Sequence, residues 1–93
     1  MSAATKRHLA RVAALPCALC GSMPVEVHHL MSGRVPGRRS SDWLAIPLCP
    51  DCHRGRNGIH GQQAMLKVMR KTELDLLAET FQRVCAGIER GQA

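Results

Sequence analysis

Four cysteines lie in two Cys-x-x-Cys pairs, and their spacing predicts a metal site. The pairs are Cys17-Ala-Leu-Cys20 and Cys49-Pro-Asp-Cys52, with 28 residues between them. Two such pairs are typical of structural zinc, because four thiolates complete the tetrahedral coordination that zinc prefers in structural sites. The sequence therefore predicts one structural Zn²⁺ bound by Cys17, Cys20, Cys49 and Cys52.

A disulfide framework is the alternative, since short secreted domains are often rich in cysteine. The chain has five cysteines, so an oxidising compartment would leave one thiol over. The first residues carry Lys6, Arg7 and Arg11, and this charge does not fit a signal peptide. No apolar run approaches the length of a membrane span. We expect a cytoplasmic protein with no membrane partner.

Three histidines accompany the cysteine pairs. His28 and His29 lie between the pairs, and His53 directly follows the second pair. Successive side chains of a strand point to opposite faces, so His29 could reach a water while His28 reaches a metal. Phosphodiester hydrolysis needs an activated water and neutralised charge at the leaving oxygen. The pattern predicts this chemistry, and the alternative is that the histidines only complete the fold.

Positive charge favours a polyphosphate partner. Thirteen Lys and Arg against seven Asp and Glu give a net charge of +6, and the pI is about 9.6. Arginine suits phosphate well because its guanidinium offers forked donors. The arginines near the cysteines and histidines are expected to contact nucleic acid, and the alternative is an ordinary solvated surface; they are Arg34, Arg38, Arg39, Arg54 and Arg56.

The 93 residues are expected to form a single small α+β domain over 1–93. Trp43 and Phe81 are the two aromatic residues, so a metal would compensate for a core poor in large side chains. Hydrophobic periodicity and turn signals predict, in chain order, a helix over 5–15, a strand over 25–28, a Gly- and Arg-rich loop over 32–41, a strand over 43–47, a helix beginning at Pro50, and two helices within 62–90.

Thr72 is the expected N-cap of the last helix, with Asp75 three residues on. Within this helix, apolar residues at three- and four-residue spacing predict a buried stripe. We expect Cys85 to be buried in that stripe, Trp43 to lie in the core and His8 to face solvent or a nucleic acid backbone. The stripe consists of Leu74, Leu77, Ala78, Phe81, Val84, Cys85 and Ile88.

A strand, a loop, a second strand and a helix, with a histidine pair at one end and Cys-x-x-Cys-His at the other, form the arrangement of a ββα-metal finger. The sequence resembles an HNH endonuclease of the small phage or prophage type with four-cysteine zinc knuckles, including Ref-like relatives. Val27-His28-His29-Leu30, the Gly/Arg loop and Ile46-Pro47-Leu48-Cys49-Pro50-Asp51-Cys52-His53 carry the resemblance, which covers about 16–60.

The resemblance implies that His29 is the general base of a DNA-cleaving reaction. The asparagine of the family pattern would fall near Leu44, whose side chain cannot orient a base. Asp42 or a backbone carbonyl is the expected substitute.

The resemblance also implies that His28 and His53 bind a catalytic divalent ion, with His60 as a third ligand. Imidazole ligands favour zinc or nickel in affinity, whereas magnesium or manganese is the working ion expected in a cell. DNA is the expected partner, together with recombination or phage DNA-processing proteins. A non-catalytic zinc module that binds nucleic acid or a recombination partner is the alternative function.

Overall fold

The computed structural model describes residues 1–31, 37, 40–55 and 64–91. These residues form a small α+β structure with a radius of gyration of 13.0 Å, close to the value of about 12 Å expected for a compact chain of this length. Its elements are α1 (Ala3–Ala13), β1 (Glu26–His29), β2 (Ala45–Leu48), α2 (Pro50–Arg54), α3 (Ala64–Met69) and α4 (Glu73–Glu89).

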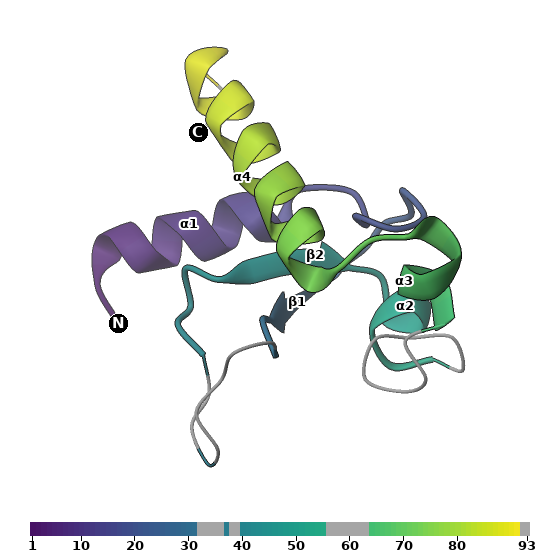
Figure 1. Cartoon of the computed structure of the whole chain (residues 1–93). Helices are drawn as coiled ribbons and strands as arrows, with labels where there is room; N and C mark the ends of the chain where they lie inside the picture. The colour runs from purple at the N-terminus through teal and green to yellow at the C-terminus, as the bar shows by residue number, and fades with distance from the viewer. Residues whose placement is uncertain (32–36, 38–39, 56–63, 92–93) are drawn as a thin grey trace.

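The sheet consists of β1 and β2, which pair antiparallel. His28 lies opposite Ile46, and His29 lies opposite Ala45. All four residues of β2 are buried, because α1 and α4 both contact this strand. Figure 1 shows α4 rising from β2 on the side away from β1, with α1 beside the sheet. The histidine pair thus lies on β1, opposite the buried strand.

Helix α1 begins two residues before the predicted start at residue 5. Ser2 explains the difference, because its side chain accepts a hydrogen bond from the Thr5 backbone N–H and caps the helix. Val12 is fully buried against Ala45 and Val84.

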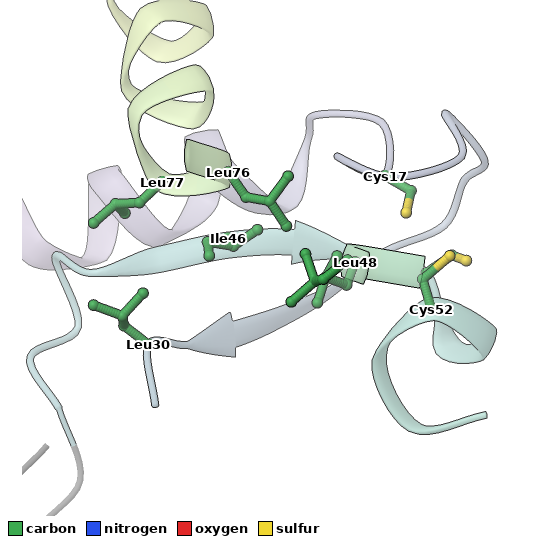
Figure 2. Close-up of a cluster of buried hydrophobic side chains, with 9 residues drawn as sticks. Cys17, Leu30, Ile46, Leu48, Cys52, Leu76 and Leu77 are labelled. Carbon is green, nitrogen blue, oxygen red and sulfur yellow. The ribbon is translucent and has the colours of Figure 1, made fainter. Parts of the chain in front are cut away.

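The main core lies along one side of β2. Ile46, Leu48 and Leu76 are fully buried, and Figure 2 shows them in a row that ends at Cys17 and Cys52. The cysteines belong to the same buried cluster as these aliphatic side chains. The cysteine pairs are therefore part of the core at this end of the sheet.

The predicted N-cap of α4 is confirmed. The Thr72 side chain accepts a hydrogen bond from the Asp75 backbone N–H, and the Asp75 carboxylate accepts one from the Thr72 backbone N–H. This reciprocal pair is a capping box, which fixes where the helix begins.

The predicted buried stripe of α4 is wrong for several members. Leu74 is 59% exposed and Ile88 is 44% exposed, and Ala78 and Cys85 are also exposed. The face of the helix that packs on the sheet is rotated from the predicted stripe and shares only Leu77 and Val84 with it. Its buried members are Glu73, Leu76, Leu77, Thr80 and Val84. Thr80 tolerates burial because its hydroxyl donates to the Leu76 carbonyl at 2.8 Å.

The predictions for His8 and Trp43 are also wrong. His8 is only 2% exposed, and its Nε2 lies 3.2 Å from the Trp43 carbonyl oxygen. The two rings stack with centroids 4.5 Å apart, so Trp43 covers His8 while remaining 43% exposed itself. Burial lowers the pKa of His8.

Candidate metal centre and histidine site

The four predicted zinc ligands come together. Their sulfur atoms all lie within 4.8 Å of one another, and the Cys20 and Cys49 sulfurs are 3.5 Å apart. Four thiolates around one zinc, at Zn–S distances of about 2.3 Å, have sulfur–sulfur separations of about 3.8 Å. The cluster therefore fits a tetrahedral metal ion such as Zn²⁺.

The first cysteine pair sits on a tight turn between α1 and β1. The Leu19 and Cys20 backbone N–H groups point at the Cys17 sulfur at 3.4 and 3.5 Å. The Gly21 N–H donates to the Cys17 carbonyl at 2.9 Å, and Gly21 has a φ of +79°. Glycine takes this left-handed conformation without steric cost, so the turn can close around its two sulfurs.

The second cysteine pair joins the end of β2 to the start of α2. Cys49 is the N-cap of α2 and Pro50 occupies its first turn, where the missing N–H of proline costs nothing. The His53 N–H donates to the Cys49 carbonyl at 2.9 Å. The helix thus places Cys52 at the metal cluster and His53 immediately after it.

The environments of the thiols differ. Hydrogen bonding from Ser22 lowers the pKa of Cys20 to about 6, whereas burial raises the pKa of Cys52. A buried thiol becomes a ligand only when a nearby cation stabilises its thiolate. All five cysteines lie in the described part of the chain, and none forms a disulfide. The alternative of a disulfide framework is therefore not the arrangement of this fold.

His28 is fully buried on the inner face of β1. Its Nε2 lies 2.6 Å from Oε2 of Glu73, the first residue of α4. The same carboxylate oxygen accepts the Met31 backbone N–H at 3.0 Å. Glu73 was not predicted from the sequence, where its only signal is a carboxylate in the first turn of an amphipathic helix.

His29 lies on the other face of β1. Its side chain is 23% exposed, and its Nε2 lies 2.7 Å from Oδ1 of Asp42. Asp42 precedes β2 in the chain, so the antiparallel pairing brings it to the end of β1 where His29 is located. The structure thus places the predicted base and its predicted orienting carboxylate in contact.

His53 extends from α2 toward β1. Its Nδ1 lies 2.8 Å from Oε1 of Glu26, and Arg54 donates from Nε to the same oxygen at 2.9 Å. Hydrogen bonds from His53 and Arg54 lower the pKa of Glu26. Arg54, expected to contact nucleic acid, thus also forms an ion pair within the fold. Glu26 was not identified from the sequence.

The rings of His28 and His53 meet edge to face with centroids 5.0 Å apart. The remaining predicted site residues lie outside the described residues; they are Arg34, Arg38, Arg39, Arg56 and His60. Among the described residues, the four cysteines are the one group of three or more Cys, His, Asp or Glu side chains close enough to share a metal ion.

The site therefore has three chemical parts: a thiolate cluster suited to zinc, a buried histidine–glutamate pair, and a partly exposed histidine–aspartate pair that could accept a proton. Within the described part of the chain, no helix combines the length and apolar character needed to cross a membrane. No protein-family model, curated protein or solved structure matches this chain.

Proposed function

We propose that this protein is a metal-dependent endonuclease of the HNH type that hydrolyses DNA phosphodiester bonds. The observation that carries the proposal is the 2.7 Å contact between His29 Nε2 and Asp42 Oδ1 on a partly exposed edge of the sheet. A histidine held by a carboxylate is a common arrangement for a general base, because the carboxylate fixes the tautomer and the orientation of the ring.

In this proposal His29 activates water. An ionised Asp42 accepts a hydrogen bond from the Nε2–H of His29, so the lone pair on Nδ1 is the one that accepts a proton from water. The ordinary pKa of histidine is near 6.5, which suits proton transfer at neutral pH. The proton passes to Nδ1 as the water oxygen bonds to phosphorus and the bond between phosphorus and the leaving oxygen breaks. The Asp42 carboxylate stabilises the resulting imidazolium, and the leaving oxygen takes up a proton from solvent.

The proposed divalent ion is held by His28 and His53. Ligand histidines usually direct their second nitrogen to a carboxylate, and Glu73 and Glu26 occupy that position. The two histidines would then bind the ion through Nδ1 of His28 and Nε2 of His53, with His60 as a further ligand. A Mg²⁺, Mn²⁺, Ni²⁺ or Zn²⁺ ion would supply charge neutralisation at the leaving oxygen.

The order of the elements also supports the proposal. The chain runs from β1, with the histidine pair, through β2 to α2, with His53 in sequence after the second cysteine pair. This order fits a ββα-metal finger braced by a structural zinc ion. DNA in the cytoplasm is the proposed substrate, and recombination or phage DNA-processing proteins are the proposed partners.

The test is nicking of supercoiled plasmid. Zinc-loaded protein is incubated with Mg²⁺, Mn²⁺ or Ni²⁺, and the same assay is run with His29→Ala and with His29→Ala plus free imidazole. We expect the wild type to nick, the variant to lose activity by about 10²- to 10⁴-fold, and imidazole to restore part of it. Zinc content and circular dichroism establish that the variant is folded. If His29→Ala still nicks plasmid, His29 is not the general base.

A second function is favoured by the pairing of the histidines. His28 and His53 each contact a carboxylate, as histidines that only stabilise a fold also do. A zinc module that binds nucleic acid without cutting it would need the histidines only for these stabilising contacts. The module is the better description if the protein binds DNA but leaves plasmid intact with every ion.

A further inference from the structure

A hollow of about 380 Å³ lies between α1 and α4, and four arginines line it. Arg7 and Arg11 come from α1, Arg83 comes from α4, and Arg90 is the C-cap of α4. Its volume is within the range of about 300 to 1,000 Å³ that is typical of ligand sites. The hollow is therefore large enough for a bound group rather than a single water.

Small residues create the space between the two helices. Ala10, Ala14 and Gly87 line the hollow together with Leu15 and Val84. No Asp or Glu is among the lining residues. Short side chains leave room where the helices meet, and the long arginines supply the polar atoms around that room. The lining thus combines an apolar surface with exclusively positive charge.

Three of these arginines are not neutralised by the rest of the described chain. Within residues 1–31, 37, 40–55 and 64–91, the side chains of Arg7, Arg11 and Arg83 form neither an ion pair nor a hydrogen bond, and Nε of Arg11 is buried without a hydrogen-bond partner. Like charges gathered in one place repel each other, and a buried donor without a partner is costly. An anion in the hollow would reduce the repulsion between the arginines and accept a hydrogen bond from Nε of Arg11.

The spacing of the arginines suits a chain of phosphates. Arg7 and Arg11 are one helical turn apart, and Arg83 and Arg90 are separated by about 10 Å along the axis of α4. One strand of duplex DNA carries a phosphate about every 3.4 Å of helix axis, so this length faces about three phosphates. A guanidinium can bind each phosphate through two parallel hydrogen bonds.

We propose that this hollow binds successive phosphate groups of a nucleic acid strand. The inference rests on the proposed function in taking nucleic acid as the ligand. The hollow is separate from the histidine site, because none of its lining residues belongs to β1, β2 or α2. The hollow would hold the nucleic acid without contacting the bond that is cut.

The experiment measures binding of a fluorescent 20-base-pair duplex by anisotropy across a series of salt concentrations. The protein carries His29→Ala throughout, so that the duplex stays intact. Arg11→Gln, Arg83→Gln and the double variant are compared with Arg70→Gln. Arg70 is an exposed arginine outside the hollow, so this control removes the same charge. Thermal melts of the zinc-loaded proteins establish that all variants are folded.

We expect each hollow substitution to weaken binding several-fold and to reduce the slope of log K against log salt by about 1, and the double variant by about 2. Arg70→Gln should change the affinity and the salt slope much less. Equal losses in Arg70→Gln would overturn the proposal, because net charge alone would then explain binding. Complete displacement of the duplex by a few millimolar inorganic phosphate would also overturn it, because the hollow would then be a site for single phosphates.

The same proteins separate this inference from the proposed function. Hollow variants made without His29→Ala are assayed for nicking at saturating protein concentration. If the hollow variants bind the duplex normally and the wild type nicks plasmid, the hollow does not bind nucleic acid but the proposed nuclease function stands. If the hollow variants bind the duplex weakly and the wild type does not nick plasmid, the hollow binds nucleic acid but the proposed nuclease function is wrong.

Discussion

His28 Nε2 lies 2.6 Å from Glu73 Oε2, and this pair joins β1 to the first turn of α4 across 45 residues of sequence. Both side chains are buried. The Met31 N–H donates to the same carboxylate oxygen, so Glu73 also fixes the chain where it leaves β1. A buried carboxylate that loses its partners would be strongly destabilising. The docking of α4 and the placement of the histidine pair are therefore coupled.

Replacing Glu73 with alanine should lower the free energy of unfolding by about 3 kcal/mol, because it leaves His28 and the Met31 N–H without this buried acceptor. Urea unfolding with zinc present measures the change. Glu73→Gln keeps one acceptor oxygen and should lose less. Glu79→Ala is the control: Glu79 pairs with Lys71, and each side chain is 32% exposed, so this pair is expected to contribute about 1 kcal/mol or less. Equal losses in Glu73→Ala and Glu79→Ala would contradict this account.

The sequence predicted the order of the helices and strands, the capping box of α4 and the cysteine cluster, because each depends on residues close in sequence or on metal-ligand spacing. It predicted Asp42 beside His29, but it did not predict the partners of His28 and His53. Glu73 and Glu26 reach His28 and His53 only after α4 and α2 pack on the sheet. Local patterns contain no information about that packing.

The error in α4 has a similar cause. Two stripes at three- and four-residue spacing overlap on this helix and share Leu77 and Val84. The predicted stripe also contains Leu74 and Ile88, whereas the buried stripe contains Leu76. Periodicity alone cannot decide which of them faces the sheet. The buried stripe lies on the same side of the helix as Glu73, which contacts His28.

Removing one cysteine ligand should remove the metal and unfold the domain. We expect zinc-loaded wild type and Cys85→Ser to retain one zinc per chain, and Cys52→Ser to lose it, as measured by native mass spectrometry. Cys85 is the matched control because it is exposed and lies outside the cluster. Structural zinc contributes on the order of 10 kcal/mol of apparent folding free energy in small peptides, so a strong chelator should abolish the cooperative melt of wild type. A melt that chelation leaves unchanged would show that the cysteines do not hold a structural metal.

Changing Asp42 to asparagine should impair hydrolysis while leaving the fold intact. The amide introduced by Asp42→Asn could no longer accept the His29 N–H as a carboxylate does, so the ring would lose its fixed tautomer. We expect plasmid nicking to fall by at least about tenfold. Asp51→Asn is the control, since Asp51 is an exposed aspartate on α2. If both variants nick at the rate of the wild type, Asp42 does not orient the base.

His8 should make stability depend on pH. Burial lowers the pKa of His8 in the folded protein, so the unfolded chain takes up a proton at higher pH than the folded protein does. The stabilising contribution of neutral His8 is fully present above the unfolded pKa of about 6.5 and is lost as pH falls below it toward the folded pKa.

The variant His8→Gln tests this dependence. Wild type and variant share all four zinc ligands, so any acid-induced loss of metal affects both in the same way. Urea unfolding at pH 7.5 and pH 5.5 gives the difference in unfolding free energy between the two proteins at each pH. We expect the advantage of wild type over His8→Gln to be smaller at pH 5.5, because protonated His8 would place a charge beneath Trp43. A difference that is the same at both pH values would mean that His8 does not titrate with folding in this range.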